Sequence, residues 1–326
     1  MDMRVAPAEL LLAQPRGFCA GVVRAIDVVD QALLLFGAPV YVFHEIVHNG
    51  HVVRGLQCRG AVFVDQIDQI PPRGVTIFSA HGVSQAVADQ AAARQLRVID
   101  ATCPLVAKVQ LQAQRYAQAG RTVLVIGHAG HDEVVGTLGR IDGPAWVVPT
   151  IAAARALDLP ADTPMAYVTQ TTLSVDDTRG IIAVLEARFP GIQGPALADI
   201  CYATQNRQTA VRLMAQRIDR LLVVGARNSS NACRLREVGE QQGVAAWLVE
   251  DASQIDPDWL LGARCIGVTA GASTPETLVQ GVCERLRALG ARTIRHLPGK
   301  PESVSFRPPA GLIDARAHLD APGLPA

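Results

Sequence analysis

One pattern occurs three times along this chain of 326 residues: an apolar segment, a short loop that contains a cysteine, and a segment whose apolar residues have helical spacing. The three copies are ELLLAQPRGFCAGVVRAIDVV, LRVIDATCPLVAKVQLQA and ALADICYATQNRQTAVRLMA. Their cysteines are Cys19, Cys103 and Cys201, which are 84 and 98 residues apart. Because that spacing is the length of a small α/β unit, the repeat predicts three similar units.

The repeat continues after each cysteine with two more apolar segments, each of which runs into a polar loop. The first set is VYVFHEIVHNG, TVLVIGHAGHDEVVG and LLVVGARNSSNACR, and the second is VTIFSAHGVS, MAYVTQTTLS and CIGVTAGAST. Strands that alternate with helical segments are typical of parallel sheets. Ligands bind beyond the carboxyl ends of such strands. The sequence therefore predicts an α/β fold of three small, pseudo-threefold-related domains whose polar loops meet at one central pocket.

The expected domains are residues 1–102, 103–199 and 200–309, with soft boundaries. The tail is rich in proline and glycine from about residue 297, and we expect it to wrap partly around a domain. Residues 310–326 are expected to be disordered.

Composition excludes several classes of function. Lysine plus arginine and aspartate plus glutamate number 30 each, so the formal net charge is zero and nothing favours nucleic acid or a membrane surface. No apolar run approaches the roughly 20 residues that a membrane span needs, and Glu9 precedes the short apolar stretch near the N-terminus, so a secretory signal is not expected. We therefore expect a cytoplasmic protein.

The seven cysteines include no CxxC pair, and a chain without a secretory signal should keep them reduced. A single cysteine is usually a small buried apolar residue. Four share no repeated position and are expected to be structural: Cys58, Cys233, Cys265 and Cys283.

Three cysteines at equivalent strand-to-helix junctions favour a shared site. Thiolates hold iron–sulfur clusters, normally four for a [4Fe–4S] cubane, so three ligands would leave one iron open to a substrate. Each cysteine also precedes a predicted helix, whose N-terminus should stabilise a thiolate and lower its pKa. Gly17 and Gly21 should let the backbone approach the cluster closely. The sequence thus predicts a cluster on Cys19, Cys103 and Cys201 that performs reductive chemistry on a small anionic substrate.

The remaining loop residues predict an anion site around the cluster. Residues at the ends of the second and third strands of each unit donate hydrogen bonds and carry little net charge, which suits a diphosphate. They are His48, His81, His131, Thr171, Thr172, Ser229, Ser230, Asn231 and Ser273. The imidazoles can become cationic against the diphosphate, although Ser230 or Asn231 can also serve as a helix N-cap.

Glu133 follows His131 by two residues in GHDEVVGT, and a buried glutamate in a polar pocket is a candidate proton donor. The alternative is a solvated glutamate in the first turn of a helix.

Nine segments resemble the 4-hydroxy-3-methylbut-2-enyl diphosphate reductase family, the iron–sulfur enzymes that end the methylerythritol phosphate route to isoprenoids. They are PRGFCAGV, HEIVHN, FSAHGVS, DATCPLV, GHAGHDEVVGT, TQTTLSVDDT, ICYATQNRQ, NSSN and TAGAST, and they extend from residue 15 to about 275.

The resemblance implies a trefoil of three α/β domains around a [4Fe–4S] cluster on Cys19, Cys103 and Cys201. It implies Glu133 as the proton donor. It also implies that the substrate ligands are His48, His81, His131, Thr171 or Thr172, Ser229, Ser230, Asn231 and Ser273. It also implies an allylic diphosphate as substrate, isopentenyl and dimethylallyl diphosphate as products, and reduced ferredoxin or flavodoxin as electron donor. No flavin or nicotinamide motif is present in the sequence, which agrees with an external donor.

This chain departs from the family pattern beside the site. The differing residues are Val23, Asp132, Val135, Ala226, Arg227, Ala232 and Cys233. They leave the cysteines and Glu133 in place, but they can alter hydrogen bonds around the cluster and its potential. They also leave open a divergent second copy of the enzyme.

Three alternatives remain at the level of sequence. One is another three-cysteine [4Fe–4S] enzyme, such as a dehydratase resembling quinolinate synthase. A second is a zinc hydrolase with cysteine and histidine ligands, although the long cysteine spacings do not resemble structural zinc patterns. The third is a non-catalytic protein that binds anions or senses redox state.

Overall fold

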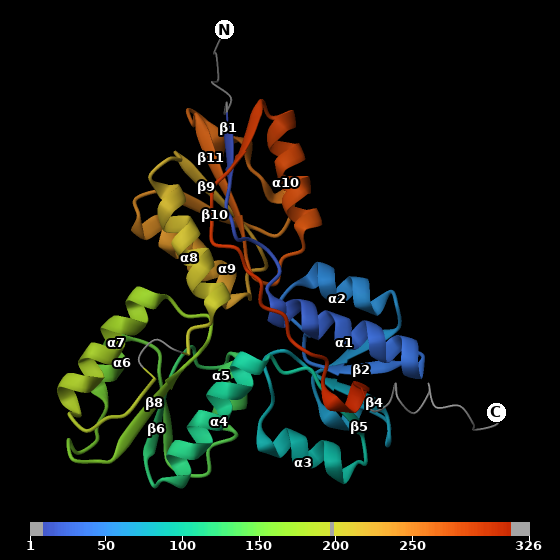
Figure 1. The fold of residues 1–326 in the computed structure, drawn as a ribbon, viewed down its shortest axis with the longest axis vertical. Coiled ribbons are helices and arrows are strands. Elements are labelled where there is room, and N and C mark those ends of the chain that lie inside the picture. Colours follow the sequence, from blue (N-terminus) through green and yellow to red (C-terminus); the bar gives the residue numbers. More distant parts are fainter. Residues whose placement is uncertain (1–8, 196–198, 314–326) are drawn as a thin grey trace.

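The computed structural model describes residues 9–195 and 199–313, and three α/β units surround a common centre in a trefoil (Figure 1). Three separate sheets form the units, and every strand pairing in the described residues is parallel. The predicted fold class is therefore confirmed.

The strand orders are β3-β2-β4-β5 in the first sheet, β7-β6-β8 in the second, and β10-β9-β11-β1-β12 in the third. The strands are β1 (Glu9–Leu12), β2 (Val40–Phe43), β3 (Ala61–Val64), β4 (Val75–Phe78), β5 (Arg97–Asp100), β6 (Thr122–Ile126), β7 (Ala145–Val148), β8 (Met165–Thr169), β9 (Arg220–Val224), β10 (Ala245–Val249), β11 (Cys265–Ala270) and β12 (Thr293–His296).

Helices connect these strands, as parallel pairing requires. The first unit holds α1 (Ala20–Phe36), α2 (Gly50–Gln57) and α3 (Gln85–Ala93). The second holds α4 (Pro104–Gln118), α5 (Asp132–Leu138), α6 (Ile151–Ala156) and α7 (Val175–Arg188). The third holds α8 (Tyr202–Ala215), α9 (Ser230–Gln241) and α10 (Glu276–Ala288).

The N-terminal strand corrects the first predicted domain boundary. β1 pairs with β11 and β12, with Leu10 opposite Ile266 and Ile294, so it belongs to the third sheet and not to a unit of residues 1–102. The strand before Cys103 likewise lies in the sheet of the preceding unit, because β5 pairs with β4 in the first sheet. Each strand before a cysteine thus joins the preceding sheet, and for Cys19 the preceding sheet is the third. The ring closes through this long-range pairing, which local sequence does not specify.

The predicted strand before Cys201 does not form as a regular strand in the described residues. Residues 196–198 lie outside them, and Asp199 and Ile200 lie in a turn and a bend. An isolated parallel bridge between Gln193 and Ala166 is the counterpart of the pairing seen in the other two units.

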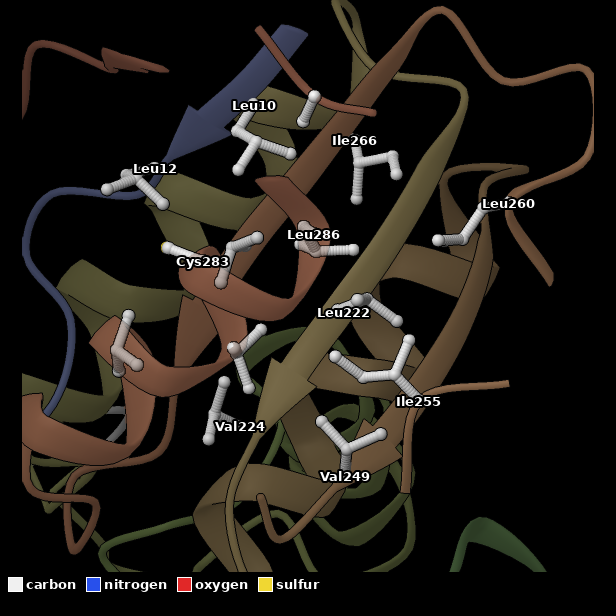
Figure 2. Close-up of a cluster of buried hydrophobic side chains, with 14 of the residues drawn as sticks. Leu10, Leu12, Leu222, Val224, Val249, Ile255, Leu260, Ile266, Cys283 and Leu286 are labelled. Carbon is white, nitrogen blue, oxygen red and sulfur yellow. The ribbon is translucent and has the colours of Figure 1, made fainter. Parts of the chain in front are cut away.

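Each sheet has a hydrophobic core on both faces, as apolar strands of a parallel sheet require. In β1 the side chains alternate: Leu10 and Leu12 pack into the core on one face of the third sheet, and Leu11 into the core on the other. Figure 2 shows the first of these cores, in which Leu10 and Ile266 face Leu286 of α10. The strands therefore hold the loops at their carboxyl ends in fixed positions.

The C-terminal segment crosses from the third unit to the first. Leu297 donates its backbone N–H to Leu12 O at 2.8 Å, and Arg24 Nε donates to Arg307 O at 2.8 Å. Residues 310–313 form a helical turn, and Leu312 is buried in a core of the first unit. The expectation of disorder is therefore wrong for residues 310–313, because burial of Leu312 anchors them, and residues 314–326 lie outside the described residues.

Cys283 is buried in the core of the third unit, but Cys58 is exposed after α2, so the expectation of a core role is wrong for Cys58. Within the described part of the chain, no helix combines the length and apolar character needed to cross a membrane.

Candidate functional site

One cavity, with a volume of about 100 Å³, lies where the three units meet. All thirteen residues that the sequence assigned to a site line it. They are Cys19, Cys103, Cys201, His48, His81, His131, Glu133, Thr171, Thr172, Ser229, Ser230, Asn231 and Ser273. The structure therefore brings the predicted residues together, and their roles remain predictions.

The three cysteines occupy the same local position. Cys19, Cys103 and Cys201 are the N-cap residues of α1, α4 and α8. Three helix N-termini, each with a partial positive charge, therefore point at one place in the cavity wall.

Backbone hydrogen bonds hold each cysteine to a neighbouring unit. The N–H groups of Cys19, Cys103 and Cys201 donate to the carbonyls of Ala272, Ala80 and Thr171 at 3.2, 3.0 and 3.1 Å. Each acceptor lies in the loop after the third strand of the preceding unit, just before or at a predicted substrate ligand. The cysteines and the polar loops are thus parts of one hydrogen-bonded frame.

Buried Arg207 of α8 reinforces this frame behind the cysteines. Its guanidinium donates to Gly17 O at 2.7 and 3.1 Å and pairs with Glu302 at 3.0 Å. It joins the helix that begins after Cys201 to the loop that carries Cys19. Sequence reasoning missed Arg207, because its role depends on segments about 190 residues apart.

Gly21 leaves room for sulfur. A β-carbon at Gly21 would lie 2.7 Å from Cys103 Sγ and 3.8 Å from Cys19 Sγ, so a larger residue would occupy the space between the two thiols. Gly17 does something different: its φ of +66° lies in the left-handed region, and a β-carbon there would meet Thr274 O at 3.0 Å.

Two of the three thiols, those of Cys103 and Cys201, have raised pKa values. Burial raises the pKa of Cys103 to about 12, and the neighbouring Cys19 adds to the shift. Burial likewise raises the pKa of Cys201 to about 11, although Thr204 hydrogen-bonds to its sulfur at 3.2 Å. The sequence-based expectation of lowered pKa values is therefore wrong for these two thiols, because burial outweighs the helix N-termini. A bound metal cation would reverse this balance.

The spacing of the sulfurs argues for a cluster and against a single ion. Within the described residues, only His48, His81 and Asp132 place three possible ligand atoms all within 4.8 Å of one another. Two sulfurs on one zinc ion lie within about 4.6 Å, twice the zinc–sulfur bond length. The three thiols are thus too far apart to share one ion, whereas in a cluster each thiolate binds a different iron. The donor set fits an iron–sulfur cluster and weighs against a zinc hydrolase.

The geometry of His48 and His81 also argues against a metal ion held by these two residues and Asp132. The rings of His48 and His81 are stacked, with centroids 4.1 Å apart and an angle of 17° between their planes. An imidazole binds a metal ion in its own ring plane, so two nearly parallel stacked rings do not aim at one ion.

The three imidazoles instead form a group whose nitrogens suit an anion. His131 lies edge-on to His48 and His81, at centroid distances of 5.2 and 5.8 Å. Burial lowers the pKa of His131 to about 4, and His48 contributes; burial also lowers the pKa of His81 well below its usual value. His48 Nε2 is buried and has no hydrogen-bond partner in the described residues. An anion here would satisfy that nitrogen and favour the imidazolium forms.

Hydroxyl and amide groups line the cavity beside the imidazoles. Thr172 Oγ1 donates to Ser230 Oγ at 3.1 Å, across the second and third units. Ser273 Oγ donates to His48 O at 3.0 Å, and Asn231 Oδ1 accepts from Ala272 N at 2.8 Å. These bonds join all three units around the polar side of the cavity.

Ser229 is the N-cap of α9, and its hydroxyl accepts from Ala232 N. The suggestion that Ser230 or Asn231 caps this helix is therefore wrong, because the helix already begins at Ser230, at least one residue earlier than that assignment requires.

Glu133 lies between the two sides of the cavity and is 2% exposed. Its carboxylate accepts from the backbone N–H and the hydroxyl of Thr171 at 2.7 and 2.9 Å. Burial raises its pKa to about 7 against these hydrogen bonds. The solvated alternative is therefore wrong, and Glu133 can hold a proton near neutral pH.

His131 is the N-cap of α5, and its Nδ1 accepts from Glu133 N at 3.2 Å. In the neutral ring the proton is then on Nε2, which leaves Nε2 as a donor.

Two polar residues near the cavity were not assigned to the site from the sequence. Gln170 donates to Thr172 Oγ1 at 2.8 Å, and Asp132 Oδ1 lies 3.1 Å from His44 Nδ1. Asp132, one of the departures from the family pattern, thereby joins the second unit to the first. From the sequence it stood out only as a departure from the family pattern beside His131.

Comparison with known proteins agrees with this arrangement. A family model described as "LytB protein" matches residues 10–287. The chain is 58% identical over 304 residues to "4-hydroxy-3-methylbut-2-enyl diphosphate reductase 2" of Bradyrhizobium diazoefficiens, covering 93% of this chain and 99% of the relative. It is 58% identical over 320 residues to "4-hydroxy-3-methylbut-2-enyl diphosphate reductase" of Bordetella pertussis, covering 98% of each.

A solved structure shares the fold. The E-1-hydroxy-2-methyl-but-2-enyl-4-diphosphate reductase from Plasmodium falciparum superposes with a TM-score of 0.91 at 35% identity, covering 97% of this chain and 100% of that one. The family match, the identity over nearly the full length and the common fold agree. The chain belongs to the LytB family, which includes relatives named 4-hydroxy-3-methylbut-2-enyl diphosphate reductase.

Proposed function

We propose that this protein reduces 4-hydroxy-3-methylbut-2-enyl diphosphate to isopentenyl diphosphate and dimethylallyl diphosphate, the last step of the methylerythritol phosphate pathway. Its relatives at 55 to 58% identity are named for this reductase. A similar solved structure, at 28% identity and a TM-score of 0.60, is titled the terminal enzyme of the non-mevalonate pathway.

One observation carries the proposal. A single cavity is lined by three free thiols, three imidazoles and a buried glutamate. The thiols suit a metal cluster, the imidazoles suit a diphosphate, and the glutamate suits proton transfer. Neither a simple hydrolase nor an anion carrier needs all three.

The cofactor in this proposal is a [4Fe–4S] cluster on Cys19, Cys103 and Cys201. When bound, such a cluster would supply electrons one at a time and an iron that lacks a protein ligand and acts as a Lewis acid. Gly21 leaves room beside two of the sulfurs, and the three helix N-termini favour the thiolates against the added charge of the inorganic sulfides. The thiols must stay reduced, which suits the cytoplasm.

The polar side of the cavity binds the diphosphate. His131 donates from Nε2, and His48 Nε2 becomes a donor when the ring is protonated, with Glu45 accepting from Nδ1 at 3.2 Å. His81, Thr172, Ser230, Asn231 and Ser273 surround the anion, and Ser229 completes the loop. Binding the remote diphosphate holds the hydroxyl end of the substrate toward the sulfur side.

Glu133 holds the proton for the reaction. Its raised pKa keeps a large fraction protonated near pH 7, and Thr171 orients the carboxyl group through two hydrogen bonds. The substrate alcohol takes up two electrons and two protons, the C–O bond breaks, and one water leaves while a C–H bond forms. The resemblance suggests ferredoxin or flavodoxin as the source of the electrons.

An anaerobic assay tests the function. Protein purified without oxygen and supplied with the allylic diphosphate and reduced methyl viologen should form both products, which mass spectrometry detects. The same preparation should be brown and contain close to four irons per chain. A colourless protein that binds zinc after reconstitution would contradict the cofactor, and a brown protein without product would contradict the substrate.

A further inference from the structure

A second cavity lies on the other side of Cys201. Leu105 and Cys201 line both this cavity and the central one, so they form part of the wall between the two. Tyr202, Lys108 and Lys300 line the second cavity toward the surface. The proposed cluster site is thus separated from this surface by a cysteine and one leucine.

The chain has only two lysines among its 30 basic residues, and both line this cavity. They come from different units: Lys108 lies in α4, and Lys300 lies in the C-terminal segment. Both are exposed, and neither forms an ion pair within 4.0 Å with another described residue. Both ammonium groups are therefore exposed and free of a direct ion pair with a described residue.

The acidic groups nearby are already engaged. Asp199 also lines the cavity and attracts Lys108 electrostatically, but it is 4% exposed and its Oδ2 accepts from Thr169 N at 3.1 Å. Glu302, close to Lys300 in sequence, pairs with the buried guanidinium of Arg207. The neutral Gln205 and Asn206 complete the lining. Two lysines and one aspartate line this cavity, so its lining carries a net charge of +1 (+2 − 1) when all three are ionised, in a chain whose formal net charge is zero.

We propose that this surface, which we call the lysine face and define by Lys108, Lys300, Tyr202 and Gln205, docks a small acidic protein that carries one electron, of the ferredoxin or flavodoxin class. The inference rests on the proposed function, because only a reductase with an external donor needs such a face. Since the whole chain has no net charge, attraction of an acidic carrier must come from a local patch.

The electron count explains why lysine suits this face. Each substrate needs two electrons, and a carrier that delivers one must dock, be oxidised and leave twice for every water released. Such complexes are small and short-lived. Lysine provides a hydrated, mobile charge that attracts a partner without fixing it in one geometry, whereas arginine forms rigid bidentate pairs.

The test compares two electron donors on the same variants. Lys108→Gln, Lys300→Gln and the double variant are assayed with flavodoxin kept reduced by NADPH and its reductase, and separately with reduced methyl viologen. For the double variant at low ionic strength, kcat/KM for flavodoxin should fall by about 10-fold or more. The dye-driven rate and the iron content should stay unchanged. The loss should shrink as salt is added, because salt screens exposed charges.

A matched control removes two positive charges elsewhere. Arg73→Gln with Arg292→Gln neutralises exposed arginines that precede β4 and β12, at the opposite ends of their strands from the central cavity. This control should keep the flavodoxin-dependent rate within about twofold. An equal loss in the control, or an unchanged kcat/KM in the double lysine variant, overturns the lysine face. Absence of dye-driven turnover in the parent protein overturns the proposed function itself.

Discussion

The central cavity is lined by thiols, here called its sulfur side, and by imidazole, hydroxyl and amide groups, here called its polar side. The thiols disfavour negative charge, whereas the imidazoles disfavour positive charge. On the sulfur side, burial raises the pKa values of Cys103 and Cys201 to about 12 and 11, so negative thiolates are disfavoured. On the polar side, burial lowers the pKa of His131 to about 4, so the positive imidazolium is disfavoured. One physical cause, removal from water, thus acts on both sides.

The difference indicates that the two sides bind ligands of opposite charge: the sulfur side binds a metal cation, and the polar side binds an anion. Iron on the sulfur side would draw protons off the thiols, and metal loading should release protons. A diphosphate on the polar side would favour protonated histidines, and its binding should take protons up. Glu133 lies at the boundary, where it keeps its proton near neutral pH.

The largest expected effect comes from breaking the sulfur side alone. Cys103→Ser removes one proposed cluster ligand, so iron content should fall and turnover should drop by at least about 10³-fold. Inorganic diphosphate, measured by calorimetry, should still bind within about threefold of the parent, because the polar side is intact. Cys58→Ser is the matched control, since Cys58 is exposed and remote from the cavity lining. Full iron content in the Cys103 variant would remove this residue from the cluster.

The next effect comes from the boundary residue. Glu133→Gln keeps the shape of the side chain but removes the transferable proton, so turnover should fall about 10²- to 10⁴-fold. Iron content and diphosphate affinity should remain. In the parent, turnover should fall as pH rises through about 7, where Glu133 loses its proton. Glu240→Gln, on the exposed part of α9, serves as the control. Unchanged turnover in the Glu133 variant would exclude it as the proton donor.

A third prediction concerns the stability of the metal-free protein. The folded pKa of Glu133 is about 7, above its ordinary 4.5, so its contribution is full below pH 4.5 and is lost as pH rises through 7. The folded pKa of His131 is about 4, below its ordinary 6.5, so its contribution is present above pH 6.5 and is lost as pH falls through 4. From pH 5 to pH 7, the ionisation of Glu133 should lower the free energy of unfolding by about 2 kcal/mol. Over the same range, the deprotonation of His131 should raise it by about 2 kcal/mol.

Urea unfolding of two variants separates the contribution of Glu133 to the free energy of unfolding from that of His131. Relative to the parent, Glu133→Gln should gain unfolding free energy from pH 5 to pH 7, and His131→Gln should lose it. The parent serves as the reference in which the two terms nearly cancel. Parallel pH curves for all three proteins would contradict the assigned directions.

The smallest expected effect comes from removing one hydrogen bond to Glu133. Thr171→Val removes the hydroxyl that donates to Glu133 at 2.9 Å and leaves the backbone N–H bond at 2.7 Å. Since both bonds lower the pKa of Glu133, the descending limb of the pH–rate profile should move up by about one pH unit or less. Thr171→Ser should restore the parent profile. A limb that moves down would show that the hydroxyl does not stabilise the carboxylate.

Local pattern predicted much of this molecule. The three cysteines do cap α1, α4 and α8, because a strand–loop–helix signature is readable within about 20 residues. The loop residues at the ends of β2, β6 and β9 likewise reached the cavity, because parallel strands bring their carboxyl ends to one edge. Arg207 was not predictable, since its partners Gly17 and Glu302 are 190 and 95 residues away.

The sequence by itself determined three repeated units, the cysteines at equivalent helix starts, and a set of polar loop residues suited to an anion. Each of these depends on short-range pattern and side-chain chemistry. The tertiary structure alone decided that β1 completes the third sheet, that burial reverses the expected pKa shifts of Cys103 and Cys201, and that Cys201 separates two cavities. These depend on which distant segments pack together and exclude water, and no local pattern specifies that.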